Sequence, residues 1–164
     1  MKNYLFLAAL MILFSGCYSF KDVSIQPPEV KTARVNFIEN KAPYVNPQLG
    51  PQLTDRLRQK VNNQTRLTLI QGEEAHYEIT CEIRGYNIST SGISQQTASS
   101  SRLTVTVHIN FQNRLDQKYN FEADISRSFD FDANLSLQQA EQQKGDEILK
   151  NLTDEIFNRI FSNW

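Results

Sequence analysis

The sequence predicts an α+β domain in which a largely antiparallel sheet carries two amphipathic helices on one face. The observations behind this prediction are runs with alternating apolar residues, two stretches with helical apolar spacing, and the order β-α-β-β-β-α along the chain. The strands are apolar on one side only, which is typical of an antiparallel sheet with one covered face. We therefore expect a two-layer sandwich with a sheet of about four strands and a second, polar sheet face.

The first strand and the first helix are predicted in the amino-terminal third of the domain. Between Lys31 and Glu39, apolar and polar residues alternate, which favours a strand. A proline-rich loop follows, and the helix begins either at Asn46-Pro47 or at Gly50-Pro51, because proline is favoured at a first helical position. Apolar residues then recur at every fourth position: Leu49, Leu53, Leu57 and Val61.

The next strand changes phase at a glycine. Residues 77–83 have apolar side chains at odd positions, whereas Tyr86 and Ile88 are even. An extra residue in a strand exchanges its two faces, so a β-bulge or sharp bend is expected at Gly85. Residues 89–101 are uncharged and rich in Ser, Thr and Gln, which indicates a flexible loop or a loosely held hairpin end.

A hairpin and a long helix complete the predicted domain. Residues 103–111 alternate without a break, and residues 119–131 follow after a short polar turn, which predicts an antiparallel pair interrupted on its apolar face by Arg127. Ser136 and Gln139 form a capping box ahead of the last helix. Gly145 costs about 1 kcal/mol relative to Ala inside a helix and is where a kink or a frayed opening is expected.

The first seventeen residues predict export and lipidation. Lys2 precedes an apolar run from Tyr4 to Phe14, which is too short to span a membrane because a spanning helix needs roughly 20 residues. The following Ser15-Gly16-Cys17 resembles a bacterial lipobox. That resemblance implies a diacylglycerol on the Cys17 thiol, cleavage before this residue, and acylation of the new amino terminus, with palmitate among the expected acyl groups. The alternative is an ordinary secretory signal with an incidental cysteine.

The expected organisation is therefore a signal peptide over residues 1–16, a lipidated terminus and tether over residues 17–30, and one folded domain over residues 31–164. Pro27-Pro28 and the weak periodicity before Lys31 are typical of an extended tether. Several acyl chains on one terminus make a membrane anchor effectively permanent. The predicted location is consequently lipid-anchored.

Composition excludes several classes of function. The formal net charge is −1 at pH 7, and non-specific nucleic-acid binding requires a strong basic excess, so no nucleic-acid partner is expected. Once Cys17 is lipidated, only Cys81 is left, and no intramolecular disulfide is available. Cys81 alternates in phase with Ile79 and Ile83, which favours a small core residue over a reactive thiol.

The residues that enzymes require do not combine into a recognisable site. His76 and His108 stand neither in a metal-ligand spacing nor beside a plausible nucleophile. A glycine-rich phosphate loop is also missing from the sequence. We therefore predict that the protein is not an enzyme and needs no metal or cofactor.

Basic residues in or beside the predicted strands are candidates for binding phosphates of an anionic glycolipid. Several of them would gather at one end of the sheet if the strands pair as predicted, and arginine offers bidentate geometry whereas lysine offers a point charge. The alternative is an ordinary set of solvated charges. The candidates are Arg84, Arg102, Arg114, Lys118 and Arg127.

A family resemblance is spread over nearly the whole mature chain. The stretches that carry it are Asn46-Pro47, Leu53-Thr54 with Leu57, Gln64-Thr65-x-Leu67-x-Leu69, Gly85-Tyr86, Arg102 to Val107, Glu155 to Asn158, and Trp164. Together with the lipobox, they resemble LptE, the lipopolysaccharide-assembly lipoprotein of the Gram-negative outer membrane, in the form found in Bacteroidetes. The resemblance implies a sheet with two helices seated in the lumen of LptD, the large outer-membrane β-barrel that inserts lipopolysaccharide into the outer leaflet.

The function implied by the resemblance is that of a plug and assembly partner of LptD in lipopolysaccharide transport, on the periplasmic side or within the barrel lumen. A polar sheet face suits the polar interior of such barrels. Arg102, Arg114 and Lys118 are the candidate lipopolysaccharide contacts, although no local motif matches them to family positions. The competing hypothesis is an independent periplasmic lipoprotein that binds or carries a small hydrophobic ligand, which requires a roomy apolar pocket between sheet and helices.

Overall fold

The structure is a computed structural model that describes residues 25, 28–44, 46–94 and 97–162. The predicted signal peptide, Cys17 and most of the tether lie outside the described residues, as does Trp164. The described chain forms two α-helices, six strands and one 3-10 helix. In chain order they are β1 (Thr32–Val35), β2 (Glu39–Asn40), α2 (Leu49–Gln64), β3 (Thr68–Leu69), β4 (Tyr77–Ser94), β5 (Thr97–Asn113), η1 (Gln117–Tyr119), β6 (Phe121–Asp132) and α3 (Leu137–Phe161).

The predicted α+β architecture is confirmed, with a larger sheet than expected. The strand order is β3-β1-β4-β5-β6, and β2 also pairs with β4. The long strands β4, β5 and β6 are antiparallel, as predicted, whereas β1 and β2 run parallel to β4, and β3 runs parallel to β1. The additional strands β2 and β3 have two residues each. Such short strands show no period-two pattern, so the sequence predicted about four strands rather than six.

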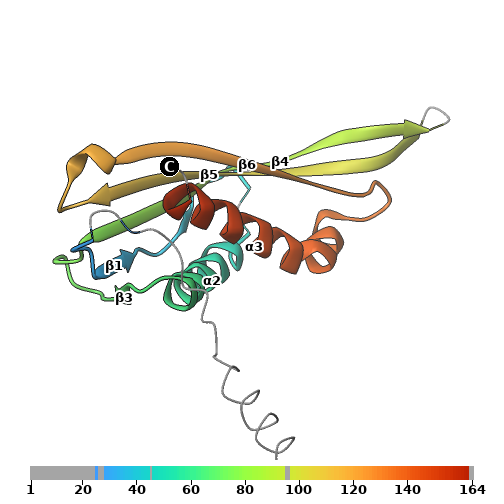
Figure 1. Cartoon of the computed structure of the whole chain (residues 1–164). Helices are drawn as coiled ribbons and strands as arrows, with labels where there is room; N and C mark the ends of the chain where they lie inside the picture. The colour runs from blue at the N-terminus through green and yellow to red at the C-terminus, as the bar shows by residue number, and fades with distance from the viewer. Residues whose placement is uncertain (1–24, 26–27, 45, 95–96, 163–164) are drawn as a thin grey trace, which may run out of the picture.

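Helices α2 and α3 cover one face of the sheet (Figure 1). The core between the layers is formed by the odd-numbered side chains of β5 and by the apolar stripes of both helices; Ile109, Leu57 and Leu152 are fully buried there. Lys60 of α2 joins the helices, because its Nζ lies 2.6 Å from an Asp154 carboxylate oxygen of α3. Each fully buried Leu or Ile contributes about 1.5–3 kcal/mol, so this layer supplies most of the stability.

Core packing begins before β1. Val30 is buried, and Ile25 packs against the core cluster. The strand expected between residues 31 and 39 is shorter than predicted, because β1 ends at Val35 and pairing resumes only in β2. Between the two strands the chain crosses the beginning of α2.

The crossing of Ile38 over α2 fixes where the first helix lies. The Ile38 N–H donates to the Thr54 hydroxyl at 3.0 Å, and that hydroxyl donates to the Gly50 carbonyl at 2.8 Å. The helix begins at Leu49, between the two expected starts, and its N-cap is Gln48, which makes no side-chain cap hydrogen bond. The Asn46 side chain instead accepts from the Gln48 N–H at 3.0 Å in the turn before the helix. Gly50 is therefore a packing residue inside the first turn and not the start of the helix.

The bulge predicted at Gly85 is confirmed. The β4–β5 register shifts between Ile83 and Gly85, and both Ile83 and Tyr86 point into the core side as a result. A Cβ at Gly85 would lie 3.0 Å from the Cβ of Thr106, so the glycine also permits a close approach of the two strands.

Residues 89–94 and 97–101 belong to the paired strands β4 and β5, so the segment is a hairpin end rather than a loop. β4 continues to Ser94, β5 begins at Thr97, and the pair forms an arm that projects beyond the helices (Figure 1). Backbone pairing requires only extended chain, and a segment without a helix layer against it has no apolar face to give an alternating pattern. Further register shifts flank Gly92.

Helix α3 is continuous from Leu137 to Phe161, so the frayed opening expected at Gly145 is not found. The capping box is confirmed: the Ser136 hydroxyl accepts from the Gln139 N–H at 3.3 Å, and the Gln139 side chain accepts from the Ser136 N–H at 2.9 Å. Arg127 of β6 reaches α3, where it forms an ion pair with Glu155. This partner explains why a cation interrupts the apolar face of the strand.

Two glycines in helices should respond oppositely to alanine. A Cβ at Gly50 would overlap the Ile38 carbonyl oxygen, whereas a Cβ at Gly145 would meet nothing within 4 Å. Gly50→Ala should therefore lower the free energy of unfolding by about 1–3 kcal/mol through overpacking, despite the better helix propensity of alanine. Gly145→Ala should raise it by up to about 1 kcal/mol. Urea denaturation measures the free energy of unfolding of both variants. A shift of both values in the same direction would contradict the close crossing of Ile38 over Gly50.

Candidate functional surface: the polar face of the sheet

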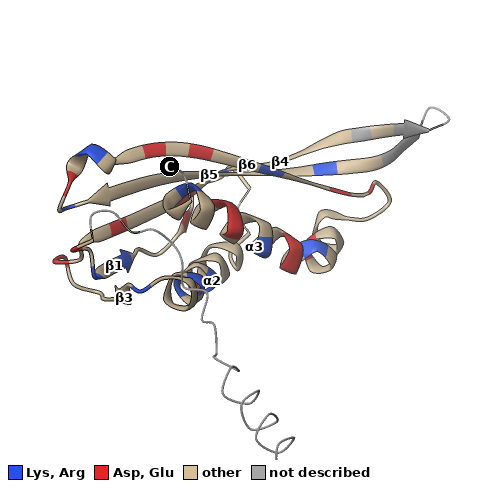
Figure 2. Ribbon diagram, viewed as in Figure 1, with Lys and Arg blue, Asp and Glu red and all other residues tan. Residues whose placement is uncertain are grey.

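The sheet face opposite the helices is polar along its whole described length, and we refer to it as the polar face. Its side chains alternate with the buried ones, and the strand registers place them beside one another. Figure 2 shows acidic and basic residues along these strands, whereas the described outer part of the β4–β5 arm carries none. The residues are Arg34, Glu78, Thr80, Glu82, Arg84, Arg102, Thr104, Thr106, His108, Asn110, Glu122, Asp124, Ser126, Ser128 and Asp130.

Side chains on β5 and β6 pair across the strands. Thr104 and Ser128 are hydrogen-bonded at 2.9 Å, and Thr106 and Ser126 at 2.8 Å. Each pair is directly opposite in the strand register, where cross-strand side chains interact most strongly. The polar face therefore satisfies many of its own hydrogen-bonding groups without cover from another layer.

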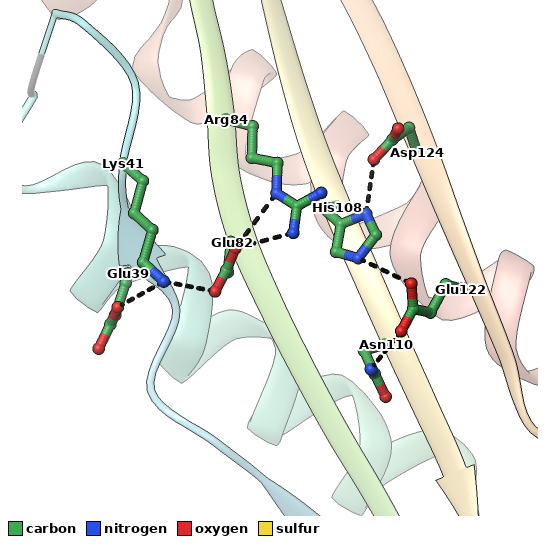
Figure 3. Close-up of polar contacts among 8 residues, drawn as sticks. All are labelled: Glu39, Lys41, Glu82, Arg84, His108, Asn110, Glu122 and Asp124. Carbon is green, nitrogen blue, oxygen red and sulfur yellow. Dashed lines mark hydrogen bonds and ion pairs between the residues drawn. The ribbon is translucent and has the colours of Figure 1, made fainter.

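His108 lies between two carboxylates of β6 (Figure 3). Its Nδ1 is 2.7 Å from Asp124 Oδ1, and its Nε2 is 3.7 Å from Glu122 Oε2. Glu122 also accepts from the Asn110 amide at 2.9 Å. The sequence placed His108 on the polar side of its strand but did not indicate these partners, since only the register of β5 and β6 brings them together.

Glu82 is shared by two cations from different parts of the chain (Figure 3). Lys41 Nζ lies 2.5 Å from Glu82 Oε1, and Arg84 contacts Glu82 Oε2 at 3.1 Å. The hydrogen bonds from Lys41 and then from Arg84 lower the pKa of the Glu82 carboxyl. Glu39 is a second carboxylate beside Lys41, at 3.3 Å. Lys41 thus ties the loop after β2 to the central strand.

Glu78 joins β1, β4 and the end of β5. It forms an ion pair with Arg34, and it accepts from the Asn36 amide and from an Arg114 guanidinium nitrogen, each at 3.1 Å. Burial alone would raise the pKa of the Glu78 carboxyl, but the donated hydrogen bonds from Asn36, Arg34 and Arg114 lower it below its ordinary value. Among the ion pairs of the described chain, Arg34 and Glu78 form the least exposed one, with side-chain exposures of 17% and 16%.

The cations predicted to bind a glycolipid lie at opposite ends of the sheet. Arg102 is at the start of the arm, where it forms a bidentate pair with Asp130 at 2.7 and 2.9 Å. Arg114 and Lys118 lie together beyond the other end of β5, and Lys118 pairs with Asp116 at 2.9 Å. The strand between the two ends spans about 40 Å. The structure therefore brings Arg114 and Lys118 to one region and separates Arg102 from them.

The other residues that the sequence singled out have structural contacts. Arg84 pairs with Glu82 on the polar face. His76 Nδ1 accepts from the Lys31 N–H at 3.0 Å. Cys81 is buried, as predicted, and burial raises the pKa of its thiol to about 12, so the thiol stays protonated at neutral pH.

Two further properties of the described residues bear on function. Within them, no group of three or more His, Cys, Asp or Glu side chains is arranged to hold a metal ion. None of the helices in the described part of the chain has the length and apolar character needed to cross a membrane.

Comparison with known proteins identifies the family. The family model for LptE, described as lipopolysaccharide-assembly, matches residues 30–160. The chain belongs to the LptE family. This result confirms the resemblance found in the sequence. A search of curated proteins gives no significant match.

Solved structures with the same fold come from several bacteria. The hypothetical protein CT253 from Chlamydia trachomatis has a TM-score of 0.54 and 12% identity, over 79% of this chain and 95% of that one. Protein XCC0632 from Xanthomonas campestris has a TM-score of 0.52 and 12% identity, over 82% and 88% of the two chains. Rare lipoprotein B from Shewanella oneidensis gives a TM-score of 0.43 at 13% identity, over 77% and 92%, which is too low to support an argument. At these identities the first two matches show the fold alone.

Membership of the LptE family makes the chain a lipoprotein of the lipopolysaccharide-assembly group in the cell envelope. The family is non-enzymatic, and it works with LptD in lipopolysaccharide transport.

Replacing Glu78 tests whether its network stabilises the sheet. At neutral pH, Glu78→Gln should lower the free energy of unfolding by about 1–3 kcal/mol, because it leaves the poorly exposed Arg34 without its carboxylate. A lowered pKa in the folded state means that this stabilisation is present above the ordinary pKa of Glu and is lost as the pH falls through the folded value. The difference between variant and wild type should therefore shrink below about pH 4.

The matched control is Glu122→Gln, since Glu122 lies on the same face with a side chain that is 64% exposed. Its effect should be below about 0.5 kcal/mol. Thermal denaturation at neutral and acidic pH measures both variants. An equal effect of Glu78→Gln at both pH values would show that the ionised network adds no stability.

Proposed function

We propose that this chain is an outer-membrane lipoprotein that acts as plug and assembly partner of an LptD β-barrel in lipopolysaccharide transport and insertion. The polar face is the observation that supports this proposal best. It is a long, hydrogen-bonded sheet surface that neither described helix covers. The interior of a large outer-membrane barrel is polar, so the two surfaces match in chemistry.

The ion pairs of the polar face are weak enough for the face to be stable in water and also to bind a polar partner. Most of its ion pairs are at least partly exposed, such as Arg102–Asp130 with side-chain exposures of 46% and 53%. Exposed pairs contribute about 0–1 kcal/mol each, so they can be exchanged for polar groups of a barrel wall at little cost. The core on the other side of the sheet is not disturbed by that exchange.

The lipid anchor belongs to the same proposal. Residues 1–16 are removed as a signal peptide, Cys17 carries the acyl chains, and the tether over residues 17–30 leads to the folded body over residues 31–164. Because Ile25 and Val30 already pack against the folded body, only residues 17–24 count as free tether, and fully extended they reach at most about 26–29 Å. The anchor therefore keeps the plug close to the membrane in which its barrel assembles.

The packing between sheet and helices counts against the alternative of a carrier for a small hydrophobic ligand. Between sheet and helices, Ile79, Leu57 and Ile156 have no solvent exposure, and they belong to one continuous core cluster. A core packed in this way counts against a roomy apolar cavity between the layers.

Cross-linking from the polar face tests the barrel partnership. A photo-reactive amino acid at Ser126, which is exposed on the polar face, should form a covalent adduct with a large β-barrel protein in native membranes. Affinity purification of the lipoprotein followed by mass spectrometry identifies the adduct.

The matched control is the same amino acid at Gln59, an exposed residue of α2. It should give less of the barrel adduct if the polar face is the principal contact. A lipoprotein that never co-purifies with a barrel, and forms no adduct from Ser126, would overturn the proposal.

We also propose that Arg102, Arg114 and Lys118 contact phosphates of lipopolysaccharide. Replacing all three with Gln should weaken lipopolysaccharide binding by roughly tenfold or more at low salt, because one charge-assisted hydrogen bond contributes about 1.5–3 kcal/mol. Circular dichroism should show an unchanged fold, since all three side chains are well exposed.

Two partial variants test the contribution of each end of the sheet to lipopolysaccharide binding. Arg114→Gln with Lys118→Gln changes one end, and Arg102→Gln changes the other. Binding is measured at low and high salt, because screening weakens exposed charge interactions. Unchanged binding of the triple variant at low salt would exclude these cations as contacts.

A further inference from the structure

A groove lies on the helix side of the molecule, at the base of the projecting arm. It has a volume of about 410 Å³ and is bounded by the first turn of α2, the first half of α3, and β4 just beyond the bulge. Small-ligand sites usually have volumes of about 300–1,000 Å³, so the groove is large enough for one. Its residues come from three segments that are far apart in the sequence.

Two stacked tyrosines form an aromatic wall of the groove. The rings of Tyr44 and Tyr86 are 5.3 Å apart between centroids, with an interplanar angle of 26°. Tyr86 is only 5% exposed, and its hydroxyl donates to Glu141 of α3 at 2.5 Å, which fixes the ring. Tyr44 lines the groove and is 43% exposed, so its ring is available to a ligand.

The remaining polar lining consists mainly of amide side chains. Each amide offers both donors and an acceptor, which matches the paired donors and acceptors of sugar hydroxyl groups. Lys and Arg are missing from the described lining, and its single carboxylate, Glu141, is already engaged by Tyr86. This lining does not suit a phosphate or carboxylate ligand. The amides are Asn46, Gln48, Gln52, Gln138 and Gln142.

Gly145 supplies a second observation, independent of the lining chemistry. It lies on the groove in the middle of α3, where glycine weakens a helix and where a Cβ would meet nothing within 4 Å. Packing therefore gives no reason for a glycine at this position. The missing side chain leaves the helix backbone open to the groove, as glycine does where a ligand approaches closely.

We propose that this groove binds an uncharged saccharide. Tyr44 stacks against a sugar ring, the amides hydrogen-bond its hydroxyl groups, and Gly145 leaves room for the ring against α3. The prediction that the groove binds a saccharide follows from its lining alone. The further assignment of this saccharide to the sugar chain of lipopolysaccharide rests on the proposed function.

The test measures saccharide binding by the full lipoprotein in a zwitterionic detergent, because glycoside detergents carry sugars of their own. Saturation-transfer NMR is recorded with a dephosphorylated oligosaccharide released from lipopolysaccharide, with lipid A, and with maltohexaose as an unrelated neutral sugar. We expect binding of the oligosaccharide by the wild type. Tyr44→Ala should weaken it by roughly tenfold, through loss of the stacking contact.

Gly145→Leu separates binding from stability. It should abolish oligosaccharide binding by filling the groove, while the melting temperature stays the same or rises, because the position is a helix interior with open space. Tyr119→Ala is the matched control: Tyr119 is 38% exposed at the far end of the sheet and does not line the groove, so its replacement should leave binding unchanged.

The outcomes distinguish the groove from the proposed function. Absence of oligosaccharide binding, or binding that both groove variants leave intact, overturns the saccharide site. Equal binding of maltohexaose, lost in the same variants, supports the saccharide site and overturns its assignment to lipopolysaccharide. Because no barrel is present in the experiment, failure of the barrel partnership cannot produce any of these results.

Discussion

The antiparallel pairing of β4 with β5 is the interaction on which the rest of the structure depends. β1 and β2 attach to β4, β6 attaches to β5, and both helices pack on the face that these strands present. The register of the pair decides which side chains enter the core, and a shift of one residue would exchange the two faces. The bulge makes that exchange between Ile83 and Gly85, so Ile83 and Tyr86 both face inward.

The division of the sheet into two faces explains how a small domain can present a wide polar surface without losing stability. Large core side chains such as Ile109 and Leu152 are buried on the helix side, whereas the polar face is held by contacts such as those of Glu78 and Glu82. These contacts link strands that are neighbours in the sheet but distant in the sequence. They stabilise strand pairing, yet most of them are exposed enough to be rearranged by a polar partner.

The sequence was sufficient to predict the elements that have their own periodicity. Local patterns in the sequence predict the strands around Cys81 and over residues 103–111, the capping box at Ser136, and the bulge at Gly85. The short strands β2 and β3 do not, because their pairing depends on a neighbouring strand rather than on their own residues. The contacts of His108 and the separation of Arg102 from Arg114 likewise depend on the register of β5.

The groove could not be predicted from the sequence, although Gly145 was one signal for it. Its walls come from a loop, a strand and two helices, and no local pattern joins Tyr44 to Glu141. Gly145 was visible as a glycine that weakens a helix, and the sequence alone indicated a kink or a frayed opening there. In the structure the helix does not fray at this position, and a Cβ there would meet nothing within 4 Å. A glycine that the fold does not need is a reason to look for a ligand beside it.

The bulge at Gly85 affects both the groove and the polar face. Without the extra residue at Gly85, Tyr86 would point to the polar face, and the groove would lose the ring against which Tyr44 stacks. The same irregularity therefore places an aromatic residue on the helix side while the polar face continues along β5 and β6. The groove is lined by residues of α2, α3 and β4 on the helix side, and the polar face lies on the opposite side of the sheet, so the two binding events that we propose use different surfaces. The two proposed binding surfaces share no side chain.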